Sequence, residues 1–402
     1  MIIFTDEQEK LIQEAINWYH NSSEQVFQYS GGPGTGKSVV MNEIIKRLKL
    51  KVSQVAPMCY VGAAAINLRL KGLSNAKTIH SWLYEPVEVP MIDEHGEPIM
   101  DTYLNRQKIE IRFVPKDLTG IELMAIDEGG TVPLNMREDI LSRGKKILVA
   151  GDLDQLPPVA DKSAFLYNGK VYKLTQIMRQ AQNSPIVFLC QRAKNGYPIQ
   201  NGLYGNDVYV ISEDEVTDSM IYHSGVLLCG KNTTRDRLNS YIRNNILGYT
   251  TDLPNMGEKL ICRKNNWLLE VGGINLTNGL TGTVVNQPDV SKFDGKSFYI
   301  DFAPDLMKSE LGIFYDTAVD YEYFIANRET KNMIKSTQYR FKANLFEYGY
   351  SQTVHLAQGS QWNNGMYYEE YLHPNINNSL NYTALSRFKQ KCIYVKPKRK
   401  YF

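Results

Sequence analysis

The first half of the chain alternates short apolar runs with segments that carry apolar residues at helical spacing. Each run is four to six residues long, which is typical of a strand buried on both faces of a parallel sheet. Apolar runs lie at residues 121–126 and 146–150, strands are also expected at residues 26–29 and 52–56, and the helical segments lie at residues 39–50 and 61–70. Pro57 is expected to end the strand at residues 52–56. This alternation predicts an α/β fold built on a parallel sheet.

A second α/β region is expected to begin near residue 202, where the strand pattern restarts after a glycine-containing linker. Its expected elements are strands at residues 225–229, 366–368 and 393–395 and a helix at residues 234–247. We therefore expect two domains, at residues 1–201 and 202–402.

Two segments interrupt the α/β pattern. Residues 86–113 have apolar side chains on both sides of a polar stretch at residues 93–98, which predicts a β-hairpin inserted in the first domain. From about residue 252 to residue 346, short strand patterns are separated by glycines. This second segment predicts a small β-barrel inserted in the second domain.

One motif between the first predicted strand and the first predicted helix indicates chemistry. Gly31, Gly36, Lys37 and Ser38 fit the pattern G-x-x-x-x-G-K-[ST] of a phosphate-binding loop. Glycines allow consecutive backbone N–H groups to turn toward a triphosphate, and the lysine reaches its β- and γ-phosphates. The Ser38 hydroxyl is a ligand for Mg²⁺. The sequence therefore predicts a protein that binds ATP and Mg²⁺.

Asp127 and Glu128 follow the apolar run at residues 121–126. The carboxyl ends of parallel strands carry site residues, and an ATPase needs carboxylates opposite its phosphate loop. We expect Asp127 to hold Mg²⁺ together with Ser38, and Glu128 to orient and deprotonate the attacking water. With Lys37, this pair predicts a nucleoside triphosphatase.

Composition and charge exclude several other classes. The longest apolar runs are far shorter than the roughly 18 residues that a membrane helix needs. The five cysteines are scattered and form no Cys-x-x-Cys pair, so we expect reduced thiols, no zinc site and a cytoplasmic protein without a secretory signal. A formal net charge of +2 does not by itself demand a nucleic-acid partner, so any such contact has to come from a local groove.

A further motif narrows the class. Residues 151–159 place Gln155 after a predicted strand, and with this motif the chain resembles superfamily 1 helicases of the RecD and Dda group. The resemblance extends in order through Gln8, the phosphate loop, Ala56 and Pro57, residues 78–80, Asp127 and Glu128, Gln155, residues 174–180, residues 232–239, residues 353–359 and residues 382–387. It implies two RecA-like domains, and it identifies the second insertion as an SH3-like barrel that braces a wedge formed by the hairpin.

The resemblance also implies roles at the nucleotide. Gln8 would bind the adenine edge, Gln155 would sense the γ-phosphate, and Arg179 and Arg387 would be arginine fingers. Guanidinium groups suit that role because they are planar and permanently charged. The remaining nucleotide-binding positions are Gly34, Thr35, Gly36, Lys37, Ser38 and Gly359.

For nucleic acid, the matching segments would line a groove for single-stranded DNA. Their hydroxyl, imidazole and amide groups suit contacts with phosphates, and their rings suit base stacking. The positions are Pro57, Thr78, His80, Thr353, His355 and Gln358. Trp82, in the same region, is expected to be a core residue rather than a stacking platform.

The implied activity is an ATP-driven helicase or translocase that moves 5′ to 3′ on single-stranded DNA and acts at junctions of single-stranded and duplex DNA. The group's small residue and serine after the acidic pair are here Gly129 and Gly130, and Leu356 stands where a lysine is frequent. Two alternatives remain open: a translocase that does not separate strands, and a nucleotide-dependent binding module that has lost coupling. An RNA substrate also remains open. We expect a monomer, with a replication or recombination protein as a possible partner.

Overall fold

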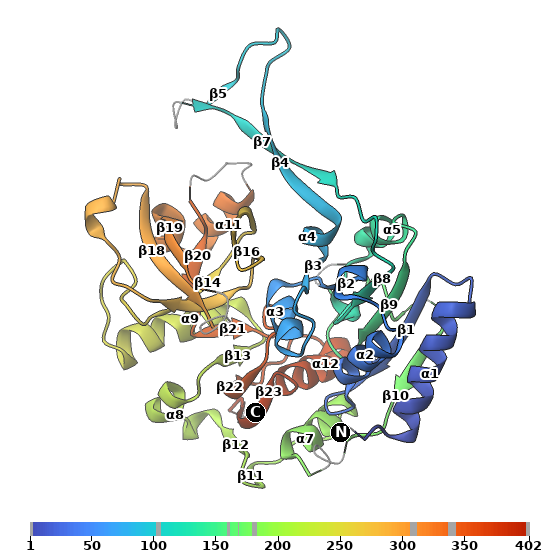
Figure 1. Cartoon of the computed structure of the whole chain (residues 1–402). Coiled ribbons are helices and arrows are strands. Elements are labelled where there is room, and N and C mark those ends of the chain that lie inside the picture. Colours follow the sequence, from blue (N-terminus) through green and yellow to red (C-terminus); the bar gives the residue numbers. More distant parts are fainter. Residues whose placement is uncertain are drawn as a thin grey trace.

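The computed structural model describes residues 3–101, 106–158, 161–167, 169–178, 183–305, 312–336 and 343–398. Two six-stranded sheets and one five-stranded sheet form its framework, and a long two-stranded hairpin projects from it (Figure 1). No helix among these residues is both long and apolar enough to cross a membrane.

The first sheet has six parallel strands in the order β10-β1-β9-β8-β2-β3. The strands are β1 (Val26–Gly31), β2 (Val55–Cys59), β3 (Lys77–Thr78), β8 (Leu123–Ile126), β9 (Lys146–Gly151) and β10 (Val171–Leu174). The helices are α1 (Asp6–Asn21), α2 (Lys37–Arg47), α3 (Gly62–Leu70), α4 (Ile79–Leu83) and α5 (Arg137–Leu141). The four strands and two helices predicted for this region are confirmed, with ends shifted by at most three residues.

Both faces of this sheet are buried, because helices cover each of them. Leu123 and Ala125 of β8 pack in one core with α1 and α2, whereas Met124 and Ile126 pack in a second core with α4 and α5. The period-two alternation therefore places apolar residues on both faces, which explains why the runs in the sequence are continuous.

The prediction that Pro57 ends its strand is wrong. Pro57 lies inside β2, where it is paired in register with Ala125 of β8. Its carbonyl accepts a hydrogen bond of 2.8 Å from the indole Nε1 of Trp82, so this residue faces away from β8. The N–H and C=O of one strand residue point to the same side, and the missing N–H therefore removes no hydrogen bond from the β2–β8 ladder.

The second sheet has the order β11-β12-β23-β22-β13-β21, and only the β11–β12 pair is antiparallel. The strands are β11 (Gly202–Tyr204), β12 (Val208–Ser212), β13 (Leu227–Cys229), β21 (Ser351–Thr353), β22 (Trp362–Tyr368) and β23 (Phe388–Lys396). The helices are α7 (Pro185–Lys194), α8 (Asp218–His223), α9 (Asn232–Tyr241) and α12 (Pro374–Leu385). The strands predicted at residues 225–229, 366–368 and 393–395 are confirmed, and so is the helix predicted at residues 234–247, of which α9 forms the first part and a π-helical turn the rest.

Helix α7 belongs to the core of this second sheet although it precedes residue 202. Leu189 and Cys190 of α7 are buried with Leu385 of α12 and with Val208 and Val210 of β12. The chain therefore leaves the first sheet before α7 begins, while β11 and β12 follow it.

The third sheet is antiparallel and is inserted between α9 and β21. Its strand order is β19-β18-β17-β14-β20, and a separate pair, β15–β16, lies beside it. These strands are β14 (Lys259–Cys262), β15 (Asn266–Val271), β16 (Ile274–Leu276), β17 (Thr281–Val284), β18 (Ser297–Pro304), β19 (Phe314–Asp320) and β20 (Phe346–Tyr348), with helices α10 (Tyr321–Ile325) and α11 (Arg328–Ser336). Ile66 of α3 is buried in the core of this insertion, so the insertion packs against the first region.

The hairpin connects α4 to β8. Its strands, β4 (Tyr84–Pro90) and β7 (Ile109–Pro115), pair antiparallel along their whole length. Two shorter strands, β5 (Met100–Asp101) and β6 (Arg106–Gln107), pair nearer its tip. In Figure 1 the hairpin extends well beyond the rest of the chain. Its base contacts the insertion, because the ring centroids of Phe113 and Trp267 lie 5.9 Å apart.

Candidate active site

The phosphate loop runs from the end of β1 to the first turn of α2. Gly34 and Gly36 both have φ near +80°, a conformation that side chains rarely adopt, and Gly36 is the N-cap of α2. A Cβ at Gly36 would stand 2.7 Å from Nε2 of Gln8. The loop therefore needs glycine at residue 36. The positive end of the α2 dipole and the backbone N–H groups of its first turn point into the site, which favours phosphate binding.

Lys37 and Ser38 begin α2 and face two different partners. The Lys37 ammonium donates a hydrogen bond of 2.6 Å to the carbonyl of Gly31, within the loop itself. The Ser38 hydroxyl donates to Oδ2 of Asp127 at 3.2 Å and accepts from Nζ of Lys71 at 2.9 Å. The hydroxyl and carboxylate oxygens of Ser38 and Asp127 are the hard ligands that Mg²⁺ prefers, so these two residues fit a Mg²⁺ site.

Gln8 lies directly behind the loop and is 1% exposed. Its Oε1 accepts from the backbone N–H of Thr5, which closes the capping box of α1, and its Nε2 donates to the carbonyl of Thr35 at 2.8 Å. The amide thus ties the start of α1 to the phosphate loop. Both of its polar atoms are occupied by protein groups, so contact with an adenine remains a prediction.

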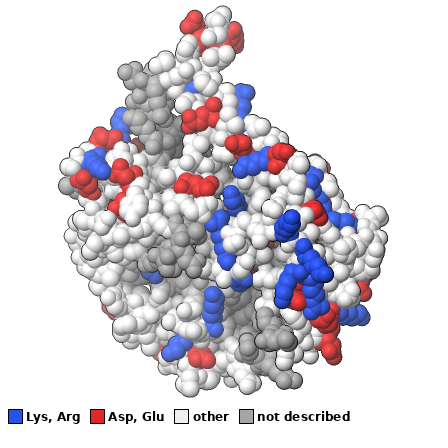
Figure 2. All heavy atoms as spheres, in the orientation of Figure 1, with Lys and Arg blue, Asp and Glu red and all other residues white. Residues whose placement is uncertain are grey.

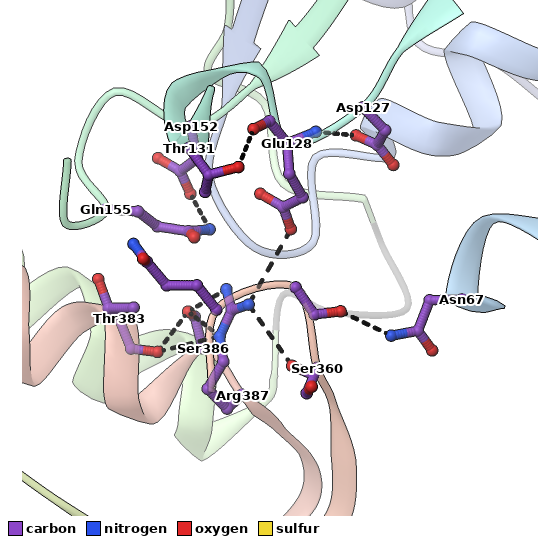
Figure 3. A network of polar contacts seen from close by, with 12 residues as sticks. Asn67, Asp127, Glu128, Thr131, Asp152, Gln155, Ser360, Thr383, Ser386 and Arg387 are labelled. Carbon is purple, nitrogen blue, oxygen red and sulfur yellow. Dashed lines mark hydrogen bonds and ion pairs between the residues drawn. The ribbon is translucent and has the colours of Figure 1, made fainter. Parts of the chain in front are cut away.

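Glu128 follows β8 in a strained backbone conformation. Its φ of +53° and ψ of +39° are left-handed, which few residues with long side chains adopt. Thr131 holds this turn by donating two hydrogen bonds to the Glu128 carbonyl, from its hydroxyl at 2.7 Å and from its N–H at 2.9 Å. Oδ1 of Asp127 accepts from the Glu128 N–H at 2.9 Å. As Figure 3 shows, the Glu128 side chain points away from β8 toward Arg387.

Arg387 comes from the second sheet's region, just after α12, and is 1% exposed. Its Nη1 lies 4.0 Å from Oε1 of Glu128. Its other contacts hold the guanidinium in place, since it donates to the carbonyl of Thr383 at 3.2 Å and to the hydroxyl of Ser386 at 2.9 Å. In Figure 3, Gln155 lies beside Glu128, and Arg387 lies across the gap from both.

A cavity of about 650 Å³ brings the candidate residues of both regions together. The predicted residues that line it are Gly34, Gly36, Lys37, Ser38, Asp127, Glu128, Gln155 and Arg387. Thr35 is buried beside it, where its carbonyl accepts the hydrogen bond from Gln8. The prediction for Arg179 falls outside the described residues.

Gly359 is placed away from the lining of this cavity. Its φ is +78°, and a Cβ there would stand 2.7 Å from Cβ of Ala64 in α3. Its carbonyl accepts a hydrogen bond of 2.8 Å from Nδ2 of Asn67 (Figure 3). Gly359 therefore joins the second sheet's region to α3.

Sequence reasoning missed several residues that line this cavity or lie next to it. Lys71 and Lys389 line it from the two regions, and the pKa of Lys389 is lowered by burial first and then by Lys71. Tyr382 donates a hydrogen bond of 2.7 Å to Oδ2 of the buried Asp152, which also accepts from Gln155. Tyr382 falls within a matched motif and could have been singled out, whereas nothing local in the sequence marks Lys71.

The predicted nucleic-acid residues divide into two groups. Thr353, His355 and Gln358 line a second cavity, of about 440 Å³, with Tyr60 and Pro158 from the first region. Burial lowers the pKa of His355, so its imidazole is neutral at pH 7 and offers hydrogen bonds rather than charge.

Pro57, Thr78 and His80 do not line that cavity. Thr78 is buried and caps α4, accepting from the N–H of Ser81 at 3.2 Å. His80 lies among rings at the base of the hairpin, with its centroid 5.3 Å from that of Trp267, and burial lowers its pKa. Trp82 is half-buried, with its indole N–H on the carbonyl of Pro57.

Among the residues that the structure describes, no cluster of three or more His, Cys, Asp or Glu side chains is arranged to hold a metal ion. All five cysteines are free and buried. Ser38 and Asp127 would hold Mg²⁺ here, one through its hydroxyl and one through its carboxylate.

The parallel sheet, the phosphate loop and the acidic strand end define a P-loop α/β protein. The AAA domain family model matches residues 4–207, half of the chain. The chain belongs to this family.

Two curated relatives match most of the chain. RecBCD enzyme subunit RecD of Buchnera aphidicola subsp. Schizaphis graminum is 25% identical over 402 residues, which cover 83% of this chain and 64% of that protein. The ATP-dependent RecD2 DNA helicase of Deinococcus radiodurans is 25% identical over 384 residues, which cover 90% of this chain and 46% of that protein. The chain thus spans less than two thirds of the length of these relatives.

Solved structures show the same fold. Pif1 helicase from Bacteroides in complex with ADP-AlF3 and ssDNA aligns with a TM-score of 0.56 at 16% identity, over 98% of this chain and 92% of that chain. Pif1 helicase from Candida albicans aligns with a TM-score of 0.51 at 17% identity, over 98% of this chain and 95% of that chain.

Proposed function

We propose that this chain is an ATP-dependent helicase that moves on single-stranded DNA, 5′ to 3′, and separates duplex at a junction. One observation carries the proposal: Arg387 of the second sheet's region lies 4.0 Å from Glu128 of the first, across the cavity that holds the phosphate loop. A nucleotide site completed from two sides couples ATP turnover to the relative position of the two regions.

At the nucleotide, each residue has a distinct task. Lys37 and the loop N–H groups bind the β- and γ-phosphates, and Ser38 and Asp127 would hold Mg²⁺, which supplies positive charge at the phosphates. Glu128 accepts a proton from the attacking water, and Arg387 offsets negative charge on the transferred phosphoryl group. Gln155, tied to Asp152, would report the presence of the γ-phosphate to the second sheet's region. Arg179 remains a predicted second arginine finger.

On the nucleic-acid side, the cavity lined by Thr353, His355 and Gln358 is the proposed path of the strand. It lies where the two regions meet, because Gln358 Nε2 donates to the carbonyl of Leu156 at 2.6 Å. A change in the distance between the regions therefore changes the shape of this groove. This change in shape is the proposed source of each step along the strand. Pro57 and Thr78 are proposed to shape the groove's first half through backbone position rather than direct contact.

The hairpin of β4 and β7 is proposed as the wedge at the junction, and the β14–β20 insertion as an SH3-like barrel that braces it. Support comes from the ring contacts of Phe113, His80 and Trp267 at the hairpin base. Figure 2 shows acidic side chains at the hairpin tip, whereas Lys and Arg side chains gather lower on the same face. An acidic tip repels the phosphate backbone, which suits an obstacle better than a binding surface.

We propose that the first RecA-like domain ends before α7 rather than at residue 201. The packing of α7 with α12 and β12 supports this boundary. We further infer a cytoplasmic protein that acts as a monomer on DNA, with a replication or recombination protein as partner. The similarity to a subunit of the RecBCD enzyme supports such a partner.

ATP hydrolysis measured with and without single-stranded DNA tests the proposal. We expect strong stimulation by DNA, loss of hydrolysis in Lys37→Ala because the β- and γ-phosphates lose their lysine, and persistence of DNA binding in that variant. Hydrolysis that is indifferent to DNA would support the uncoupled binding module instead. Undiminished turnover in Lys37→Ala would refute the site assignment.

A further inference from the structure

A third cavity, of about 320 Å³, lies between α9, α11 and the end of β14. We name it the α9–α11 pocket. Its lining residues that carry charge are Arg235, Asp236, Arg263, Arg328, Lys331, Lys335 and Glu347. Five of these side chains are cations and two are carboxylates, so the pocket has a formal excess of positive charge although the whole chain is nearly neutral.

Glu347 of β20 already forms ion pairs and a hydrogen bond inside the pocket. Its carboxylate lies 3.4 Å from Nη2 of Arg235 and 3.1 Å from Nε of Arg263, and it accepts a hydrogen bond of 2.6 Å from the hydroxyl of Tyr323. Burial alone would raise its pKa, but the two guanidinium groups outweigh burial and lower the pKa to about 2. One carboxylate thus contacts two arginines and a tyrosine, and its charge also acts on Lys331 and Lys335, so it faces four cations.

Arg263 is left with an unused donor. Its Nη1 is buried, and no described residue accepts a hydrogen bond from it. A buried guanidinium N–H without an acceptor is costly, and such groups in native proteins call for an explanation such as an absent ligand. An anion in the pocket would supply the acceptor.

The lysines of α11 add to the same excess. Arg328, Lys331 and Lys335 recur at a spacing of three and four residues, so they share one side of α11, and both lysines lie over the ring of Tyr323. The pKa of Lys335 is lowered to about 8, by burial first and then by repulsion from Arg263. Cations that repel one another in this way favour the binding of an anion among them.

The pocket is continuous with the proposed nucleic-acid groove. Asn232, Arg235 and Arg263 line both the α9–α11 pocket and the cavity that contains Thr353 and His355. A chain of phosphates that lies in the groove can therefore reach the pocket without crossing the protein surface. This continuity with the groove favours a phosphate of the bound strand over a free small anion as the ligand of the pocket.

We propose that the α9–α11 pocket binds a backbone phosphate of the nucleic-acid strand that lies in the adjacent groove. The proposal rests on the proposed function, because it requires a strand in that groove. Arg263 Nη1 and the ammonium of Lys335 are the donors expected to contact the phosphate, and Arg328 and Lys331 add charge around it. The insertion thereby contributes to strand binding as well as to the hairpin base.

Binding of a fluorescent oligothymidylate, measured by anisotropy over a series of salt concentrations, tests the pocket. The variants are Lys335→Gln and Arg328→Gln, and the matched control is Lys292→Gln, which removes an exposed lysine paired with Asp316 outside the pocket. Lys335→Gln should weaken binding about fivefold and reduce the slope of log K against log salt by about 0.7, the value for one phosphate contact on a single strand. Arg328→Gln removes charge but no direct contact, so it should change affinity and slope in the same direction by a smaller amount. Lys335→Arg should restore both, and Lys292→Gln should change neither.

The outcomes separate the two proposals. If the wild-type protein does not bind the oligonucleotide, the proposed function fails and the pocket has no strand to bind. If the wild type binds but both pocket variants keep its affinity and salt slope, the pocket inference is overturned while the function stands. Binding of an acidic peptide is measured in parallel. If the variants lose the peptide but keep the oligonucleotide, the pocket binds a protein ligand and the inference is likewise overturned.

Discussion

Glu128 shows how a single residue combines strain with chemistry. A left-handed backbone costs a residue with a Cβ about 1–2 kcal/mol, and glycine would avoid that cost. The turn nevertheless places a glutamate there, held by Thr131 and Asp127, with its side chain directed toward Arg387. Strain that persists at a strand end beside a phosphate loop is expected where function requires a particular side chain.

Glu128→Gln should abolish hydrolysis while leaving ATP binding and stability unchanged, because the amide keeps the shape but cannot accept the proton. Glu128→Gly should also abolish hydrolysis without lowering the free energy of unfolding, since relief of strain offsets the entropy lost by a glycine. Glu138→Gly, at an exposed position in α5, is the control and should lose about 1 kcal/mol. Urea denaturation and phosphate release measure both properties. Equal destabilisation by the two glycine variants would contradict the strain argument.

Lys335 predicts a pH dependence of strand binding. The ammonium is charged below its pKa of about 8 and neutral above it, so affinity for a phosphate should fall as pH rises from 7 to 9. The charged and titratable groups that line the pocket with Lys335 are Arg235, Asp236, Arg263, Arg328, Lys331, Glu347 and Tyr348, and Tyr323 lies beneath its ammonium. The guanidiniums and Glu347 keep their charge in this range, and burial raises the pKa of Tyr323 beyond it.

Anisotropy titrations at pH 7, 8 and 9 at constant ionic strength measure this effect. The affinity of Lys335→Gln should fall less over the same range than that of the wild type, leaving only the contribution of Lys331, whose pKa burial also lowers. Parallel curves for wild type and variant would show that Lys335 does not contact the strand.

At the scale of elements, the packing of the turn after β8 explains one of its two consecutive glycines, Gly129 and Gly130. A Cβ on Gly129 would overlap Cγ1 of Val149 in β9, so packing against the neighbouring strand demands a glycine at this position. A Cβ on Gly130 would have its nearest neighbour, the carbonyl oxygen of Asp152, at an ordinary 3.4 Å. Gly129 therefore has a structural reason that is independent of any loss of coupling.

Gly129→Ala should lower the free energy of unfolding by about 1–3 kcal/mol, because overpacking displaces Val149 or the strand. Gly130→Ala, its neighbour, should change stability by less than about 0.5 kcal/mol and retain ATP hydrolysis. Urea denaturation of the two variants makes the comparison. Equal losses in both would show that the turn's backbone, rather than contact with Val149, decides stability.

Elements with strong local patterns were predictable, and elements that depend on tertiary contacts were not. The buried runs of β8 and β9 are apolar on both faces, so the sequence alone indicated them. Helix α12 contains Asn375, Asn377 and Asn378, which favour turns over helices, and it is stabilised by packing against α7. The position of Pro57 inside β2 depends on which side its carbonyl faces, which a sequence does not reveal.

The same division holds for the candidate site. Lys37, Ser38, Asp127 and Glu128 follow from a motif and a strand end, and the structure brings them together. Arg387 was expected only through the family resemblance, because a single arginine carries no local signal. Lys71 reaches Ser38 from the end of α3, and only the folded chain shows that contact.

At the scale of the molecule, the two α/β regions meet through polar contacts as well as through Leu156, which is buried in the core of the second sheet's region. Tyr382 bonds to Asp152, the Leu156 N–H donates to the hydroxyl of Thr383, and Asn67 bonds to Gly359. Polar contacts between domains separate and re-form more readily than apolar ones, so these hydrogen bonds suit the relative movement of the two regions that the proposed function requires. Helix α3 also reaches the insertion, where Arg69 donates to the carbonyl of Gly273 at 2.7 Å.

Strand separation of forked DNA tests the whole account most directly. Forks that carry only a 5′ tail or only a 3′ tail are incubated with ATP and Mg²⁺, with the wild-type protein and with Lys37→Ala. The account predicts separation of the 5′-tailed fork by the wild type, none of the 3′-tailed fork, and none by Lys37→Ala. DNA-stimulated hydrolysis without separation of either fork would contradict the wedge and leave only a translocase, and separation of the 3′-tailed fork would contradict the direction of movement.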